Sequence, residues 1–316
     1  MNILFLRRRA LGAGSIRGVI AASRGEDFVD PNQGVIRYFR DDFSVLRGTG
    51  MQRRGARAAV DRANLIVRWG STYELGHPPG RVLNSSAAIH RVNNKRTFRE
   101  TLVQEENDIV PATVSSSMDL NGVIGELPER MILRPERHAQ GRQLWEVNPY
   151  DLLDTVRRHG LTHWYASEYI NKVAEYRVYV ANGRVLTVAQ KTPENPDAVA
   201  WNVNQGGRFD VVRWDDWPLA ACDASIRAFR HSGLDFGGVD VMIDAEGRCY
   251  ILEINSAPSL PPLDDGRVSY RQKCMARYFN WVLRHGTDQP VHELDNGWRG
   301  FVHGAIWLPR EQREAA

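Results

Sequence analysis

The chain has few cysteines and no long hydrophobic run. Its three cysteines, Cys222, Cys249 and Cys274, show no Cys-x-x-Cys spacing, which argues against a disulfide framework and against a zinc site. No apolar run approaches the roughly eighteen residues that a membrane-spanning helix needs, so we expect no membrane association. There is also no Gly-x-Ser-x-Gly sequence, and a hydrolase nucleophile of that kind has no support.

Lysine is scarce. Only four of the 41 basic residues are lysines, at positions 95, 172, 191 and 273, so each of them is informative. The formal net charge of +3 is not that of a nucleic-acid-binding protein, and nucleic acid is not expected as a partner. The apolar residues 1–6 precede Arg7-Arg8-Arg9, which is the reverse of a signal peptide, and we therefore expect a cytoplasmic protein.

What the chain does contain is an ordinary globular composition and one unusual hairpin. Its 316 residues are 42% hydrophobic and 25% charged, which allows two or three compact domains. The segments 239–243 and 250–254 are rich in β-branched residues, and the Asp-Ala-Glu-Gly sequence between them is typical of a turn. Asp240, Glu253 and Asn255 stand in or next to these apolar segments.

Carboxylates among core-type neighbours need a physical reason. Removing an ionised carboxylate from water is costly unless a cation or several hydrogen-bond donors compensate. Mg²⁺ prefers oxygen ligands, and Asp240, Glu253 and Asn255 offer two carboxylates and an amide. The alternative is three outward-facing polar residues on an ordinary hairpin, and this segment alone leaves both interpretations open.

The remaining pattern predicts alternating strands and helices. A first region ending near residue 90 has short strands at 3–6, 65–68 and 81–83. A polar loop at 135–143, typical of a mobile flap, lies between strands at 131–134 and 144–147. Further predicted elements are helices at 94–105, 151–159, 220–232 and 270–284, a strand at 164–170, and a hairpin of 176–180 and 184–190 across Asn182-Gly183.

The order of the charged residues along these elements carries more information than any one of them. Lys95 opens a helix, Arg134 precedes the flap, Glu168 ends a strand, Glu175 opens the next, Lys191 closes its hairpin, and the acidic pair follows. This order resembles the ATP-grasp superfamily over roughly residues 80–285. Within it the chain is most similar to the protein-glutamate ligase branch of carboxylate-amine ligases, with D-alanine-D-alanine ligase as a more distant relative.

The resemblance implies an α+β fold in which two α+β subdomains clasp ATP, preceded by a small α/β domain. The implied boundaries are an N-terminal α/β domain at 1–92, a small subdomain at 93–167 with its flap at 135–143, a large subdomain at 168–286 with the metal site, and a C-terminal tail at 287–316.

The resemblance also implies how ATP is held. Lys95 and Arg134 match cations on one side of the triphosphate, and Glu175 matches the acidic residue that accepts the ribose hydroxyls. The segment of Glu168, Tyr169 and Ile170 is similar to the hinge that holds adenine through backbone groups.

The implied chemistry depends on a second group of residues. Lys191, Arg177 and Asn202 match catalytic positions near the triphosphate. Asp240, Glu253 and Asn255 match the magnesium ligands, with the family spacing of about thirteen residues between the carboxylates. The implied cofactors are ATP and Mg²⁺, with two ions expected and Mn²⁺ as an alternative metal.

Two departures from the family pattern bear on the substrate. Arg134 stands where the family usually has lysine, and arginine is larger, planar and bidentate. Gly238 stands where D-alanine-D-alanine ligase has an arginine, which disfavours that substrate. The segment 202–207, in contrast, resembles the Asn and paired glycines of the protein-glutamate ligases.

We therefore expect an ATP-dependent, ADP-forming ligase that joins a carboxylate to an amine through an acyl phosphate. The expected partners are ATP and an amino acid joined to a peptide or protein. The alternative is an ATP-binding sensor or interaction module of the same fold that has lost ligation. Intact Lys191, Asp240, Glu253 and Asn255 argue against that alternative.

Overall fold

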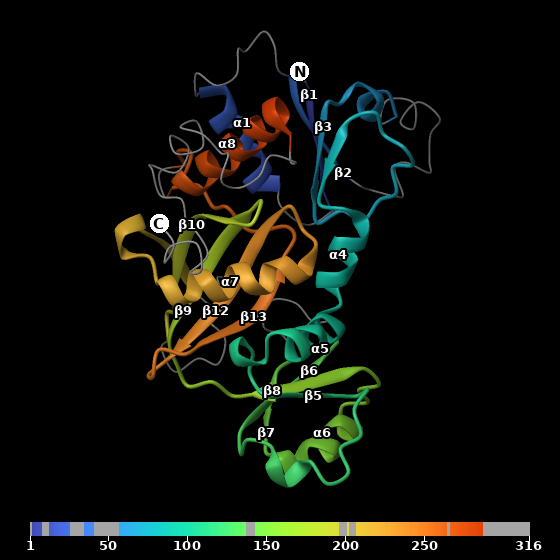
Figure 1. Cartoon of the computed structure of the whole chain (residues 1–316), viewed down its shortest axis with the longest axis vertical. Helices are drawn as coiled ribbons and strands as arrows, with labels where there is room; N and C mark the ends of the chain where they lie inside the picture. The colour runs from blue at the N-terminus through green and yellow to red at the C-terminus, as the bar shows by residue number, and fades with distance from the viewer. Residues whose placement is uncertain are drawn as a thin grey trace.

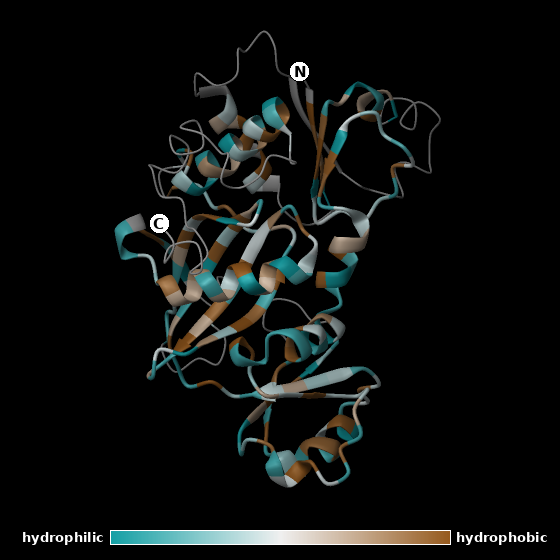
Figure 2. Cartoon of the chain, in the orientation of Figure 1, coloured by the Kyte–Doolittle hydropathy of each residue, from teal (hydrophilic) through white to brown (hydrophobic). Residues whose placement is uncertain are grey.

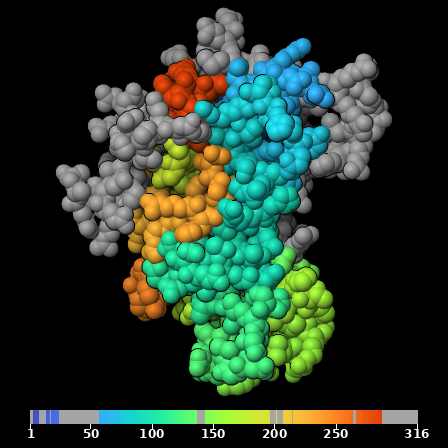
Figure 3. Space-filling view, turned by 45° about the vertical axis from the view of Figure 1, so that its right-hand side comes forward, coloured from blue at the N-terminus to red at the C-terminus, as the bar shows by residue number. Residues whose placement is uncertain are grey.

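The strands of the chain form three sheets that follow one another along an elongated molecule (Figure 1). This computed structural model describes residues 2–7, 13–25, 35–40, 57–136, 143–195, 201, 207–263 and 266–286. A parallel sheet lies at one end, a five-stranded sheet in the middle and a small sheet at the other end, an order that Figure 3 also shows on the surface. The mixture of sheets and helices confirms the predicted α+β class.

The first sheet is parallel and contains β1 (Asn2–Arg7), β2 (Val35–Arg40), β3 (Leu65–Trp69) and β4 (Arg81–Leu83) in the order β2-β1-β3-β4. Three of these strands confirm the predicted segments at 3–6, 65–68 and 81–83. Strand β2 and helix α1 (Ala13–Gly25) were not predicted.

Helix α1 packs against α8 (Tyr270–His285), the last helix of the described residues. Both belong to a hydrophobic core that also contains Phe5 and Trp69 of the first sheet and Phe236 of the five-stranded sheet. Phe279 of α8 packs edge-on against Phe5 and Phe236, with ring centroids 5.6 and 5.0 Å apart. The C-terminal helix therefore ties the first and middle sheets together.

The small sheet is antiparallel, in the order β5-β8-β6-β7, and has its own hydrophobic core. Its strands are β5 (Thr113–Ser115), β6 (Met131–Pro135), β7 (Trp145–Val147) and β8 (Trp164–Glu168). Helix α6 (Leu152–Arg158) packs against it, and α5 (Lys95–Glu105) precedes it. Asn94 caps α5 by accepting from the Thr97 N–H at 3.2 Å, so the predicted helix at 94–105 is confirmed to within one residue.

The five-stranded sheet is antiparallel, in the order β11-β10-β9-β12-β13. Its strands are β9 (Lys172–Ala181), β10 (Arg184–Thr192), β11 (Arg208–Val212), β12 (Phe236–Asp244) and β13 (Cys249–Asn255). The β9-β10 turn places Asn182 and Gly183 at φ values of 49° and 69°, as a tight hairpin of this sequence requires. The predicted hairpins are both confirmed.

Helices α4 (Ser86–Asn93), α5 and α7 (Leu219–Ser232) cover one face of this sheet. In Figure 2 the strands of the sheet carry hydrophobic residues along their length, whereas α7 shows both hydrophobic and hydrophilic residues. Short 3-10 helices lie at Asn107–Ile109, Ile124–Glu126, Pro149–Asp151 and Trp214–Asp216. Among the described residues, no helix is long and apolar enough to cross a membrane.

Candidate active site

The two faces of the five-stranded sheet differ in chemistry. Successive side chains of a strand point to opposite faces. Val178 and Val180 of β9 and Val239 and Val241 of β12 thus share one hydrophobic cluster with α7. The residues between them lie on the other face, where ion pairs join neighbouring strands. We call this surface the charged face and define it by Glu175, Arg177, Lys191, Asp240 and Glu253.

A β-bulge brings Glu253 onto the charged face. Asp240 pairs with Glu253 and Val241 pairs with Ile251, so Leu252 is an extra residue in β13. Without it, the alternation would place Glu253 beside Ile251, under α7. The bulge lets Ile251 and Ile254 both pack under α7 while Glu253 faces the cations. It therefore makes the two carboxylates cross-strand partners on one surface.

Helix α5 secures the bulge. Arg99 is buried and donates to the carbonyl oxygens of Ile251 and Leu252 at 2.7 and 2.6 Å. Burial lowers the pKa of Arg99 to about 10. The sequence analysis did not identify this residue, and its only signal is its position four residues after Lys95 on the same helix face.

Asp240 is the centre of the ion-pair network. It is 3% exposed and accepts two hydrogen bonds from Arg177 at 2.6 and 2.7 Å and one from Lys191 at 2.9 Å. Lys191 also donates to Glu175, which accepts from Lys172 at 2.5 Å. The interpretation of Asp240 as an outward-facing polar residue is therefore wrong.

The electrostatics of the network keep its members charged. Burial favours the neutral form of Asp240, but Arg177 and Lys191 outweigh it and hold the pKa of this carboxyl below its usual value. Burial likewise opposes the charge of Lys191, yet Asp240 and Glu175 raise the pKa of this ammonium. Both groups remain ionised at neutral pH.

Glu253 pairs with Lys95 across the junction between α5 and β13. Burial would raise the pKa of Glu253, but Lys95, Lys191 and Arg177 lower it well below the usual value. Asn255 donates to Glu253 at 3.1 Å. Among the described residues, no three or more His, Cys, Asp or Glu side chains form a metal cluster. Two carboxylates and an amide still suit Mg²⁺, which is usually held by one or two carboxylates together with substrate phosphates.

Arg134 differs from the other predicted cations. It lies on β6 of the small sheet, donates to Ser167 at 3.4 Å, and has no ion pair with a carboxylate in the described part of the chain. Its guanidinium carbon is 5.8 Å from the centroid of the Tyr165 ring. This guanidinium is therefore available for an anionic ligand.

The segment of Glu168, Tyr169 and Ile170 links β8 of the small sheet to β9 of the five-stranded sheet. The Tyr169 N–H donates to the Arg130 carbonyl at 2.9 Å, and Ile170 packs with Met242 and Tyr250 in a small apolar cluster. Leu252, the bulge residue, packs against the same cluster. An apolar surface thus adjoins the charged face at this link.

Several predictions lie outside the described residues. These are Asn202 with most of its segment 202–207, the centre of the flap at 137–142, and the tail at 287–316. The domain boundaries remain predictions as well. Lys172 is a residue that the sequence analysis did not assign, although its rarity was a signal: three of the four lysines lie in this network or beside it.

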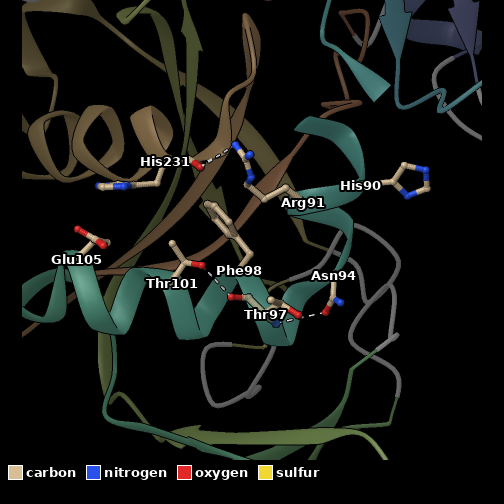
Figure 4. A pocket seen from close by; sticks show the side chains of 8 residues that line it. All are labelled: His90, Arg91, Asn94, Thr97, Phe98, Thr101, Glu105 and His231. Atoms are coloured by element: carbon tan, nitrogen blue, oxygen red, sulfur yellow. Dashed lines mark hydrogen bonds between the residues drawn. The ribbon is translucent and has the colours of Figure 1, made fainter. Parts of the chain in front are cut away.

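A pocket of about 420 Å³ lies elsewhere, between α4, α5 and α7 (Figure 4). His90, Arg91, Phe98 and His231 are among its lining residues, and Arg91 donates to the His231 carbonyl at 3.5 Å. None of the predicted site residues lines it. It adjoins the helices that cover the apolar face, so it is separate from the charged face.

Comparisons with known proteins agree on the fold. Residues 80–268 match a family model of the ATP-grasp domain, the third family of its clade. The ATP-grasp ligase PsnB, solved with a minimal precursor, has a TM-score of 0.62 at 14% identity, covering 88% of this chain and 98% of its own. The macrocyclase MdnC from Microcystis aeruginosa MRC, bound with precursor peptide MdnA, gives 0.59, 14%, 88% and 99% for the same four quantities.

D-alanine-D-alanine ligase from Bacillus anthracis, complexed with ATP, is also similar, with a TM-score of 0.53 at 12% identity, covering 82% of this chain and 87% of its own. No curated protein matches the chain. The shared fold of these structures is the predicted ATP-grasp fold, which is confirmed over most of the chain.

Proposed function

The chain belongs to this family of ATP-grasp domains, and on that basis we propose that it is an ATP- and magnesium-dependent carboxylate-amine ligase. The observation that carries the proposal is the charged face, where Asp240 and Glu253 are cross-strand partners and lie within reach of Lys95, Arg177 and Lys191. Cations that are buried and kept charged in this way are suited to stabilising phosphate charge.

In this proposal ATP lies between the small sheet and the charged face. The adenine packs on the apolar cluster of Ile170, Met242 and Tyr250, next to the backbone of the Glu168–Ile170 link. Glu175 is the candidate for the ribose hydroxyls, which requires that it exchange its ion pair with Lys172 for the sugar. Arg134 and Lys95 approach the phosphates from the small-sheet side and Lys191 from the other.

Asp240, Glu253 and Asn255 are the proposed ligands of Mg²⁺. When bound, Mg²⁺ would neutralise phosphate charge and orient the terminal phosphate. Glu253 would then release Lys95, and Asp240 would release at least one of its cations, so the same ion pairs that stabilise the ligand-free site supply free cations to the triphosphate. The number of ions and the use of Mn²⁺ remain part of the proposal.

The proposed reaction has two steps. A substrate carboxylate oxygen attacks the γ-phosphorus, the bond to the β,γ-bridging oxygen breaks, and ADP leaves. The amine then attacks the acyl carbon, and phosphate and a proton are released as the amide forms. Lys191, Arg177 and Asn202 are the candidate catalytic residues because they would stabilise the charge that shifts from the γ-phosphate to ADP.

An amino acid joined to a peptide or protein is the proposed substrate class. Peptide substrates find support in PsnB and MdnC, both solved with precursor peptides. Gly238 disfavours a single small amino acid held by a side chain at that position, because a Cβ there would lie 3.0 Å from the Pro258 Cβ and 3.4 Å from the Arg177 Cδ.

Trapping with hydroxylamine tests the proposal. The protein is incubated with ATP, Mg²⁺ and pools of amino acids and peptides, and hydroxamates are identified by mass spectrometry. We expect a hydroxamate together with ADP and phosphate. Release of AMP and pyrophosphate would contradict the acyl-phosphate mechanism, and ATP binding without any turnover would favour the sensor.

A further inference from the structure

Three cations surround the ring of Phe209, which lies on β11. The guanidinium carbons of Arg177 and Arg271 are 4.8 and 5.9 Å from the ring centroid, and the Lys191 Nζ is 5.8 Å from it. Distances of this size allow cation-π attraction, and they place Arg271, the second residue of α8, at the edge of the charged face.

Arg271 lacks the carboxylate partner that the other two cations have. Arg177 is paired with Asp240, and Lys191 with Glu175 and Asp240. Arg271 is only 5% exposed, and its Nε and Nη1 have no hydrogen-bond partner among the described residues. Its remaining nitrogen, Nη2, donates to the Phe209 carbonyl at 3.5 Å.

The nearest carboxylate that senses Arg271 is engaged elsewhere. Asp210 accepts hydrogen bonds from Thr192 at 2.6 Å and from Arg208 at 3.0 Å. A buried guanidinium without a paired anion is costly to the folded state. The first turn of α8 adds to the local positive potential, because its N–H groups and the helix dipole favour an anion there. This corner of the site therefore carries excess positive charge.

The position of Arg271 along the sheet indicates which anion it meets. Glu175, Arg177 and Tyr179 occupy one face of β9, and each two-residue step advances about 6.6 Å along a strand. Arg271 adjoins Tyr179, where its charge and that of Arg177 oppose the rise in the pKa of this hydroxyl caused by burial. Tyr179 is thus about 13 Å from Glu175, beyond Asp240 and away from the apolar cluster.

We propose that Arg271 binds a carboxylate of the amino acid or peptide substrate, next to the phosphate end of the charged face. This rests on the proposed function, which sets the direction of ATP along β9. A guanidinium matches a carboxylate with two parallel hydrogen bonds, and Arg271 has two nitrogens free for them. The same group could meet the terminal phosphate of ATP, and the experiment separates the two anions.

The test compares the wild type with Arg271→Met, which removes the charge and keeps an unbranched stem, and Arg271→Lys, which keeps the charge without the fork. Lys273→Met, an exposed lysine two residues later in the same helix, is the matched control. Binding of ATP with Mg²⁺ is measured by calorimetry. Thermal stability with Mg²⁺ and AMPPNP is then measured with a pool of L-amino acids and C-terminally free dipeptides, and with the same pool as primary amides.

We expect the free acids, and not the amides, to stabilise the wild type and the control. Arg271→Met should lose this response by about tenfold or more in ligand concentration while its ATP affinity stays within about twofold of the wild type. Arg271→Lys should recover part of the response. Without ligand, Arg271→Met should be at least as stable as the wild type, because an unpaired buried charge has been removed. Arg271→Gln replaces it if the methionine variant does not fold.

Three outcomes would overturn the inference. Equal stabilisation by acids and amides, or by neither, means that no carboxylate is bound. An unchanged response in Arg271→Met assigns a structural role only. A loss of ATP affinity as large as in Lys95→Met assigns Arg271 to the triphosphate. Failure of the proposed function is a separate result, in which the wild type releases no ADP with any pool while these binding measurements still decide the role of Arg271.

Discussion

The two faces of the five-stranded sheet are built from the same strands but do opposite work. On the apolar face, valines and isoleucines of β9, β10, β12 and β13 pack against α4, α5 and α7. On the charged face, alternate residues of the same strands form an ion-pair network in which every carboxylate meets at least one cation.

The contrast shows where stability and function are separated in this fold. Burial of the apolar side chains stabilises the protein by removing them from water. The ion pairs contribute little net stability, since desolvation of buried charges offsets much of their attraction. Charges kept at such a position need another reason, and the proposed binding of ATP and Mg²⁺ supplies it.

The largest expected effect separates the faces completely. Glu253→Gln should reduce ADP release to below about one thousandth of the wild-type rate, because a proposed metal ligand is lost, while the midpoint of thermal unfolding changes little. Ile251→Ala, two residues earlier in β13 on the apolar face, should destabilise the protein by about 2–5 kcal/mol and leave the rate per folded molecule nearly unchanged. Rates at low temperature and unfolding curves measure both. If both variants lose stability alike and activity alike, the division between the faces is wrong.

Lys191→Met should have the next largest effect. Removing one preorganised cation from the charged face should lower kcat by about a hundredfold, with a smaller change in ATP affinity. Steady-state kinetics at saturating ATP measure this. Lys273→Met, which removes an exposed lysine of α8, is the matched control. A wild-type kcat in Lys191→Met would place the phosphates elsewhere.

Arg134 should show a moderate effect on binding. Because its guanidinium has no described carboxylate partner, Arg134→Ala should weaken ATP binding by about tenfold, the loss expected for one hydrogen bond to a charged group. Arg134→Lys, which restores the residue usual in the family, should retain most of the affinity because a point charge still reaches phosphate. Calorimetry distinguishes them, and equal loss in both variants would show that the fork geometry is required.

The smallest expected effect is on stability against pH without nucleotide. The pKa of Asp240 is lowered in the folded state, so its contribution to the free energy of unfolding is present above the unfolded value of about 4 and is lost as pH falls below it. Lys191 has a raised pKa, so its contribution persists below about 10.4 and is lost only at higher pH. Asp240→Asn should therefore flatten the fall in stability below about pH 4. A slope equal to that of the wild type in urea titrations would show that Asp240 is not held ionised.

The sequence predicted the elements whose signals are local. The Asn182-Gly183 pair and the turn before Arg248 identified the two hairpins because each turn is specified by its own residues. Lys95, Lys191, Asp240 and Glu253 could be placed together because their order along the chain resembles that of a known superfamily. Lys172 and Arg99 could not, because a charged residue on a strand or helix gives no sign of which partner it meets.

The bulge at Leu252 is the clearest limit of the sequence. Ile251, Leu252 and Ile254 are all apolar, so the pattern alone cannot tell which residue is the extra one. The register follows only from pairing with β12 and from the two hydrogen bonds of Arg99. Arg271 has the same limitation, because its helix contacts β10 and β11 from a distant part of the chain.

Calorimetric titration of ATP into the wild type, with Mg²⁺ and then with EDTA, tests the central claim that the charged face holds ATP with Mg²⁺. We predict binding that is at least about tenfold tighter with Mg²⁺ and that loses this dependence in Glu253→Gln. No measurable binding at about 1 mM ATP with Mg²⁺, the upper end of ordinary enzyme affinities, or binding indifferent to both EDTA and Glu253→Gln, would contradict the claim.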